Sequence, residues 1–259
     1  MKNTIRNSAF ELLQQSEQTP PVLITEAGLL RLPEAMQRYL RYTRVVGKEP
    51  IQTVRLKQRG FFRTQPGQKW LPMVAEEYFT TDPFAFLWCG KIRLFPLISI
   101  SARDRFSDGH GSLRVKLLSL VPLADVHGPE ADQGELLRYL GEIIWFPTAW
   151  LSDELEWQAI DAQSVQVTVR QPSVTVTAVL HVNEQGQMTH LTAERYMAEG
   201  KSYRLERWSA QCEAYQEVSG MLIPTRVEVM WNLASGDFSY FRGEITEIEY
   251  NQSGKVTVF

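Results

Sequence analysis

The spacing of apolar residues changes from a helical to a strand period near residue 50. Before that point, RLPEAMQRYLRYTRVVG carries Met36 and Leu40 four residues apart, which puts them on one helix face. Pro33 suits the first turn of this helix, and Gly47 suits its end. From Gln52 onward, apolar and charged residues alternate, as is typical of strands with one buried face.

Short polar turns divide the rest of the chain into strands. FAFLWCGKIRLFPLISISARDRF predicts one or two strands, and LRVKLLSLV predicts a single further strand. Turn residues recur at 66–67, 107–111, 183–186 and 235–237. Consecutive strands with such connections predict an antiparallel meander, and a long sheet of this kind must curl.

The stretch GELLRYLGEIIWFPTAWL, residues 134–151, interrupts the strands with a helical pattern. At 100° per residue, one face gathers the apolar side chains Leu136, Leu137, Leu140, Ile143 and Ile144. The opposite face gathers Glu135, Arg138, Tyr139 and Glu142. Ordinary helices expose such a charged face to solvent, where its ion pairs contribute a few tenths of a kcal/mol each.

These elements predict a mainly β (α+β) fold. We expect one strongly bent antiparallel sheet, a half-barrel, with an N-terminal helix and a central helical insertion that covers the concave face. Residues 1–30 are expected to form an arm or short helix, and residues 31–259 a single β-rich domain. The insertion, at 125–151, is expected to act as a lid.

Composition excludes several classes of protein. The chain of 259 residues is 44% hydrophobic and 22% charged with a net charge of −3, and its basic residues are scattered, which argues against a nucleic-acid surface. The N-terminus lacks the apolar core of a secretory signal, and no run is long enough to span a bilayer, so we expect a cytoplasmic protein. Cys89 and Cys212 allow at most one disulfide, and buried reduced thiols fit that setting.

Candidate chemistry is sparse. The loop DVHGPEADQGE offers oxygen ligands and one imidazole, but a capping box with Asp132 as N-cap and Glu135 as its partner explains the same residues, so we expect no metal. His110 lies in an Asp- and Gly-rich turn without the sequence context of a catalytic serine. No glycine-rich phosphate loop is present, and no cofactor is expected.

The aromatic residues are the more informative signal. Seven Trp, twelve Phe and nine Tyr suit either a wide core or an apolar cavity, and the run WFPTAWL is too apolar for an ordinary surface loop. The residues expected to line a cavity or the lid are Trp70, Trp88, Trp145, Pro147, Trp150, Trp157, Trp208 and Trp231. Those expected to anchor the lid to the sheet are Glu135, Arg138, Tyr139, Glu142 and Arg195.

Five blocks, in order through about residues 31–250, resemble an uncharacterised bacterial domain family of unknown function. They are RLPEAMQRYL, KWLPMVAEEY, GELLRYLGEIIWFPTAWL, GMLIPTRVEVMWN and FSYFRGEITEIEY, which carry the patterns LPxxxQRYL, GELxRYLxExxWxPTA and GxxIP…W. The family's signature falls on Glu135, Arg138, Tyr139, Glu142, Trp145 and Pro147. This resemblance implies a fold and a set of signature positions but no reaction.

The C-terminal half also resembles, more distantly, the lipoprotein carriers of the LolA/LolB type. Those are bent antiparallel half-barrels whose helix-capped cavity holds acyl chains. This chain departs from them by its greater length and by lacking an export signal, which argues against periplasmic lipoprotein transport. The resemblance therefore implies a half-barrel and a capacity for an apolar ligand.

Three functions follow from these patterns. The first is a non-enzymatic binding module whose aromatic-lined cavity takes an apolar small molecule or lipid. The second is an enzyme with hydrolase-like acid/base chemistry on Glu135, Arg138 and Glu142, which requires a cleft and a carboxyl pKa raised by burial. The third is a structural protein whose aromatic surfaces meet a partner. We favour the first, because no nucleophile or metal signature supports catalysis.

Overall fold

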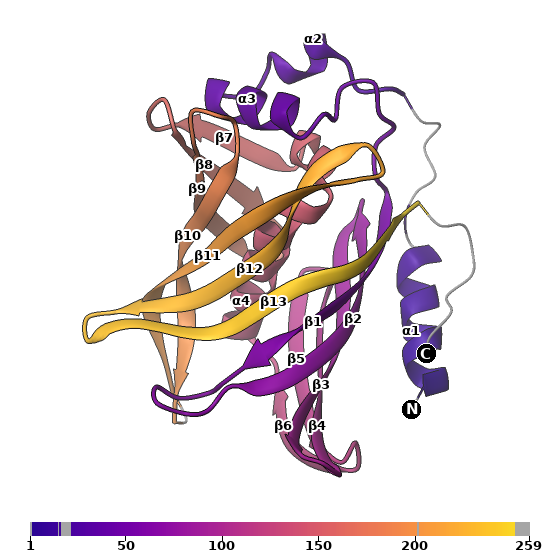
Figure 1. Ribbon diagram of the computed structural model, residues 1–259, viewed down its shortest axis with the longest axis vertical. Coiled ribbons are helices and arrows are strands. Elements are labelled where there is room, and N and C mark those ends of the chain that lie inside the picture. Colours follow the sequence, from indigo (N-terminus) through magenta and orange to yellow (C-terminus); the bar gives the residue numbers. More distant parts are fainter. Residues whose placement is uncertain (1, 15, 17–21, 201, 252–259) are drawn as a thin grey trace.

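In the computed structural model, which describes residues 2–14, 16, 22–200 and 202–251, thirteen strands form one antiparallel sheet. The first six strands are β1 (Thr53–Phe62), β2 (Leu71–Thr81), β3 (Phe84–Phe95), β4 (Ile98–Ser107), β5 (His110–Leu117) and β6 (Val121–Val126). The other seven are β7 (Leu155–Ala159), β8 (Ser164–Arg170), β9 (Thr175–Val182), β10 (Met188–Glu199), β11 (Ser202–Val218), β12 (Met221–Leu233) and β13 (Gly236–Tyr250). The predicted mainly β half-barrel is confirmed (Figure 1).

The sheet consists of two meanders joined at one seam. Its strand order is β6-β5-β4-β3-β2-β1-β13-β12-β11-β10-β9-β8-β7, so neighbours in sequence are neighbours in space except where β1 meets β13. Strands β6 and β7 are the two free edges of the sheet. Between them in the chain lies the helical insertion, which therefore connects the two edges.

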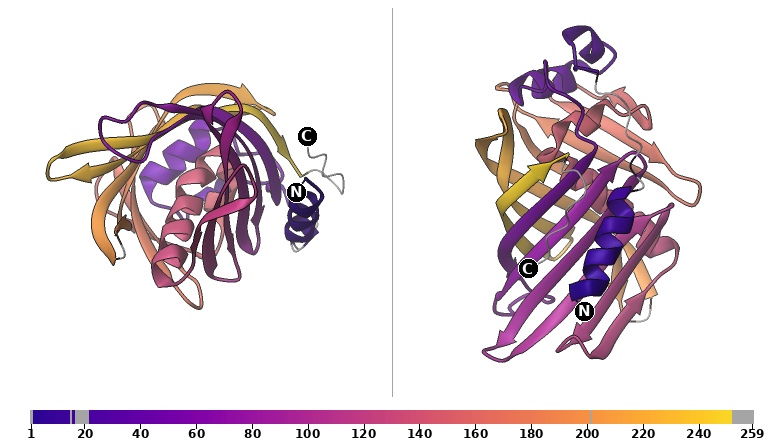
Figure 2. Two further views of the ribbon diagram at one scale, coloured as in Figure 1. Left: turned by 90° about the horizontal axis from the view of Figure 1, so that it is seen from below. Right: turned by 90° about the vertical axis from the view of Figure 1, so that its right-hand side faces the viewer.

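Three helices pack outside the concave face or at its end. Helix α1 (Lys2–Gln14) lies on the outer face of β2 and β3, where Ala9 and Leu12 pack on Tyr78, Ala85 and Leu87 (Figure 2, right). Helices α2 (Glu26–Leu29) and α3 (Glu34–Tyr42) lie at one end of the half-barrel (Figure 1). The inward residues predicted for α3, Met36 and Leu40, are fully buried.

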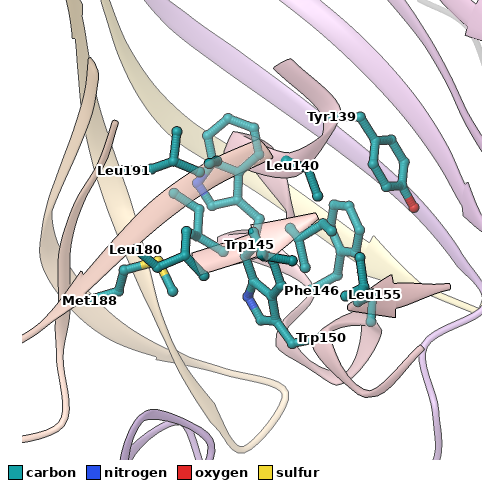
Figure 3. Close-up of a cluster of buried hydrophobic side chains, with 14 of the residues drawn as sticks. Tyr139, Leu140, Trp145, Phe146, Trp150, Leu155, Leu180, Met188 and Leu191 are labelled. Atoms are coloured by element: carbon teal, nitrogen blue, oxygen red, sulfur yellow. The ribbon is translucent and has the colours of Figure 1, made fainter. Parts of the chain in front are cut away.

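The central insertion lies inside the curve of the sheet. Helix α4 (Pro129–Glu142) is followed by two 3₁₀ turns, η1 (Ile143–Trp145) and η2 (Pro147–Leu151). Helix α4 contacts β3, β4 and β5 on one side and β9 and β10 on the other, so it bridges both arms of the half-barrel (Figure 2, left). The core forms where the insertion meets the sheet and includes Leu140, Trp145, Phe146, Trp150, Leu180 and Leu191 (Figure 3).

Several local predictions are corrected by the structure. LRVKLLSLV is not one strand: Leu118 and Ser119 have positive φ and form the turn of a hairpin between β5 and β6. This turn lacks the usual Gly, Asn or Asp, so the sequence did not signal it. Asp125 therefore lies in β6, and the helical part of the insertion begins at Pro129. Pro33 is the N-cap of α3, just outside its first turn. Residues 252–259 of the predicted domain lie outside the described part.

Candidate functional site

The buried face of α4 carries an ionic cluster, which we define as Glu77, Asp104, Glu135, Arg138 and Glu142. The Arg138 side chain is 16% exposed, and its guanidinium reaches three different elements. Its Nη2 donates to Glu77 on β2 at 2.9 Å, its Nη1 donates to Asp104 on β4, and its Nε donates to Glu142 on its own helix at 3.1 Å. The charged face of α4 is therefore not exposed to solvent as in an ordinary helix, because the sheet wraps around the helix and strands β2 and β4 cover that face.

Strand residues complete the surroundings of this guanidinium. It lies over the rings of Phe86 and Trp88 at 5.1 and 5.0 Å, a cation–π arrangement in a water-poor setting. The buried Gln58 amide donates to Glu77 at 3.2 Å and accepts from the Trp88 indole at 3.2 Å. Glu77, which is fully buried, thus has a partner for each carboxyl oxygen.

The ionic cluster contains four carboxyl groups, whereas two arginines, Arg138 and Arg195, act on them. Burial raises the pKa of Glu77, Asp104 and Glu142, and burial together with the nearby Asp104 raises the pKa of Glu135 to about 8. One oxygen each of Asp104 and Glu135 is buried without a hydrogen-bond partner among the described residues. At neutral pH, Glu135 is therefore mostly protonated, whereas Arg138 stays charged because the surrounding carboxylates outweigh the effect of its burial on its pKa.

Arg195 approaches α4 from the opposite arm of the sheet. Its guanidinium lies over the Trp208 ring at 5.2 Å and donates to the Tyr240 hydroxyl at 3.2 Å. It also lies against Gly134 of α4, where an added β-carbon would be 3.3 Å from its nitrogens. Burial raises the pKa of Asp104 and Glu135, and the charge of Arg195 offsets part of that rise. Helix α4 thus lies between two arginine-centred contacts, one to each arm.

Further contacts fix the two ends of α4. Asp132 accepts from the backbone N–H of Gly111 at 2.7 Å, and its other carboxyl oxygen lies 3.4 Å from His110. Tyr139 donates to the Thr80 carbonyl at 2.8 Å. The predicted capping box is wrong: Gly128, with φ of 111°, is the N-cap, and Asp132 lies within the helix and contacts the start of β5. The helix begins at Pro129, three residues before Asp132, because proline is favoured in the first turn of a helix.

The eight residues expected to line a cavity or lid fall into two groups. Trp88, Trp145, Trp150 and Trp208 are at most 5% exposed and form part of the core, as does the buried Pro147. Trp70, Trp157 and Trp231 are half-buried. Trp157 packs on Trp150, and Trp70 lies under the guanidinium groups of Arg63 and Arg242. The insertion thus fills the part of the concave side around η1 and η2.

Another part of the concave side carries apolar side chains that are not fully covered. We call this set the aromatic strip; it comprises the half-buried residues Phe62, Val229, Trp231, Tyr240 and Phe241 of β1, β12 and β13. Phe62 pairs with Phe241, and Phe241 pairs with Val229, in one row across the sheet. Tyr240 contacts the rings of both Phe62 and Trp231. The strip is joined to α4 through the bond from Arg195 to Tyr240.

The outer face of the same strands is of a different character. Arg59 pairs with Glu244, Arg242 with Glu228, and Lys57 with Glu247. A hollow of about 1050 Å³ crosses these strands, and its lining includes Phe61 and the first two of these ion pairs. The hollow does not include a member of the ionic cluster or of the aromatic strip.

Metal and thiol chemistry find little support among the described residues. No group of three or more His, Cys, Asp or Glu side chains there is arranged to hold a metal ion. Cys89 and Cys212 are free, and burial raises the pKa of each thiol to about 12, so neither is an activated nucleophile. His181 and His190 stack as cross-strand neighbours at 4.0 Å.

Residues 22–243 match the model of a family described as a family of unknown function (DUF6544). The chain belongs to this family. Among the curated proteins, none matches the chain. Within the described residues, no helix of this DUF6544 protein is both long and apolar enough to cross a bilayer.

Two solved structures resemble this DUF6544 chain. One is a LolA superfamily protein from Nitrosomonas europaea, with 13% identity and a TM-score of 0.39, covering 89% of this chain and 96% of that one. The other is a putative outer membrane lipoprotein-sorting protein domain from Vibrio parahaemolyticus, with 6% identity and a TM-score of 0.45, covering 79% of this chain and 87% of that one. At such identities the likeness concerns the fold alone.

Sequence patterns did not identify two of the five members of the ionic cluster. Glu77 and Asp104 lie on strands far from α4 in the chain and match no motif. A signal was nevertheless present, because Glu77 stands in the apolar phase of its strand with Ala75 and Phe79, and Asp104 stands in phase with Phe106. A charged residue in the inward phase of a strand marks a buried polar contact.

Proposed function

We propose that this protein is a non-enzymatic binding module that takes an apolar, lipid-like molecule on its aromatic strip. The observation that carries the proposal is the contrast between the two faces of the same strands. Outward positions carry cross-strand ion pairs, as a solvated face does, while the inward strip remains apolar and partly uncovered. Uncovered apolar surface that is rimmed by polar residues is typical of a binding site.

The insertion supports the same function. It fills one part of the concave side with Trp145, Phe146 and Trp150, and it leaves the strip partly uncovered. Arg195 and Tyr240 join the end of the strip to α4, so a bound molecule would contact both the sheet and the residues that hold the helix. In this arrangement the ionic cluster anchors α4, and none of its members lines the hollow on the outer face.

The acid/base alternative has one observation in its favour, the pKa of about 8 for Glu135. The same value follows from burial and from Asp104 without any catalytic role. Because Arg138 reaches Glu77 and Asp104 on two strands, we assign the cluster an anchoring role. A lost anchor lowers stability, whereas a lost catalytic group leaves stability largely unchanged.

The test uses the uncharged dye Nile red and two adjacent phenylalanines. Phe62 belongs to the aromatic strip, while Phe61 faces outward, is 48% exposed and lines the hollow on the outer face. We expect the native protein to bind Nile red, Phe62→Ser to weaken binding at least about fivefold, since a buried aromatic contact contributes more than 1 kcal/mol, and Phe61→Ser to bind normally. Mass spectrometry of a solvent extract of the purified protein would identify a native ligand.

Two results would contradict the proposal. If Phe61→Ser weakens dye binding and Phe62→Ser does not, the apolar site is the outer hollow. If the native protein binds no dye and its solvent extract contains no apolar ligand, the strip is not a ligand site. Thermal unfolding of both variants checks that each is folded during the measurement.

A further inference from the structure

A second site of different chemistry lies on the outer face, between α1 and strands β4 and β5. A hollow of about 280 Å³ is lined there by Ser8, Arg103, Arg105, Ser112 and Arg114. Ser8 comes from α1, the next two residues from β4 and the last two from β5. Three guanidinium groups and two hydroxyl groups therefore converge on one small space, and every one of these groups can donate hydrogen bonds.

The strand register places two arginines opposite each other at this hollow, unlike the Arg–Glu pairs of other outer-face strands. Arg103 stands directly opposite Arg114 in the β4–β5 pair, and like charges in that position are destabilising. Elsewhere on the outer face the opposite rule holds, as in the pairs Arg59–Glu244 and Arg242–Glu228. The sheet thus places arginine opposite arginine at a hollow that α1 borders.

Nearby carboxylates neutralise only part of this charge. Arg114 pairs with Asp125 on β6 at 3.3 Å, and Asp125 also contacts His127. Glu11 on α1 acts weakly on Arg103. No ion pair of Arg103 or Arg105 forms with another described residue, although both arginines are half-buried. Burial and the repulsion from Arg105 and Arg114 lower the pKa of Arg103, as expected for uncompensated positive charge.

We propose that this hollow binds a phosphate group, either inorganic phosphate or the phosphate of a lipid headgroup. Inorganic phosphate and a phosphomonoester headgroup carry about −1.5 to −2 charges near neutral pH, which suits a site with two unpaired arginines. Their oxygens accept the paired N–H groups of a guanidinium. The hydroxyls of Ser8 and Ser112 supply further donors at the same hollow. The site is independent of the aromatic strip, which lies on the inward face of other strands.

The experiment compares the double variant R103Q/R105Q with R59Q/R170Q, which removes the same charge from exposed arginines that have Glu partners. Binding of inorganic phosphate is measured by calorimetry at constant ionic strength, and by the rise in the unfolding midpoint. Binding to phosphatidylcholine vesicles with and without phosphatidic acid is measured by flotation. We expect R103Q/R105Q to weaken binding at least about tenfold, since each charge-assisted contact contributes more than 1 kcal/mol, and R59Q/R170Q to bind normally.

The two binding measurements distinguish a soluble phosphate from the phosphate of a lipid headgroup. Arginine-dependent binding of inorganic phosphate supports a soluble ligand, and arginine-dependent binding of phosphatidic acid vesicles alone supports a lipid headgroup. Without phosphate, R103Q/R105Q should be at least as stable as the native protein, because repulsion between Arg103 and its neighbours is relieved. The proposal is wrong if neither ligand binds, if R103Q/R105Q binds as the native protein does, or if that variant is less stable without phosphate. Normal Nile red binding by R103Q/R105Q would leave the proposed function intact.

Discussion

Arg138 and Glu77 lie 61 residues apart in the chain, and a 2.9 Å hydrogen bond joins them inside the half-barrel. The bond fixes the middle of α4 to β2, while the same guanidinium holds Asp104 on β4. Breaking a buried ion pair by removing one partner leaves a charge without compensation in a water-poor site. The stability of the inserted helix is thus tied to the protonation of a few carboxyl groups.

Arg138→Met keeps the length of the side chain and removes its charge. We expect a loss of about 3–5 kcal/mol in the free energy of unfolding near neutral pH, because Glu77, Asp104 and Glu142 lose their shared cation. Urea unfolding should show a smaller loss at about pH 5 than at about pH 8, since protonated carboxyls need no cation. Arg170→Met removes an exposed pair with Glu156 and should cost far less stability, because water screens that pair. An equal loss in both variants would contradict the anchoring role.

Glu135→Gln tests the raised pKa directly. Because the folded-state pKa of about 8 exceeds the ordinary value of 4.5, the folded protein binds this proton more tightly than the unfolded chain. This contribution to stability is fully present below about pH 4.5 and is lost as the pH rises to about 8. The glutamine side chain of the variant does not titrate. As the pH rises from about 4.5 to about 8, the native protein should therefore lose stability relative to the variant, by an amount on the order of a few kcal/mol. A difference in unfolding free energy that stays constant with pH would refute the assignment.

Gly111→Ala tests the close approach of β5 to α4. A β-carbon at this position would lie 2.9 Å from Glu135 Cγ and closer still to the Ala131 carbonyl. The helix backbone cannot yield without disturbing the bond from Gly111 to Asp132, so we expect a loss of about 2 kcal/mol or more in chemical unfolding. Gly28→Ala in α2 is the control, since its nearest contact is 3.7 Å away and alanine favours a helix. Similar stability in the two variants would show that the approach is loose.

Trp150→Ala and Trp231→Ala separate core packing from ligand binding. Trp150 is fully buried beside Trp157, so its truncation should cost about 3–5 kcal/mol in unfolding free energy. Trp231 is half-buried in the aromatic strip, and its truncation should cost less stability while weakening Nile red binding. The reverse order of stability losses would mean that the strip, and not the insertion, carries the core.

Local patterns were enough to predict the bent antiparallel sheet and the helix in its interior. Alternation and polar turns placed most strands, because one face of each packs on the core and the other meets water. The turn at Leu118 and Ser119 could not be predicted, since its positive φ values fall on residues that rarely adopt them. The start of α4 was misplaced because Asp132 serves a contact with Gly111 instead of its own helix end.

The ionic cluster shows where helix periodicity fails. A wheel drawn for α4 separates charged from apolar residues correctly, but it carries no information on what covers each side. The charged side is covered by strands β2 and β4, whose acids lie far away in sequence. Only the phase of Glu77 and Asp104 within their strands indicated that a cation should meet them.

The seam between β1 and β13 has a consequence for the order of folding. Each meander pairs only neighbouring strands, so each can form from local contacts. The seam pairs residues such as Arg55 and Glu249, which are 194 positions apart, and it lies in the middle of the sheet. Closing so long a loop is entropically slow. We therefore expect the two halves to acquire structure separately and the central ladder to join them late, so that the slowest step in refolding is the meeting of the halves.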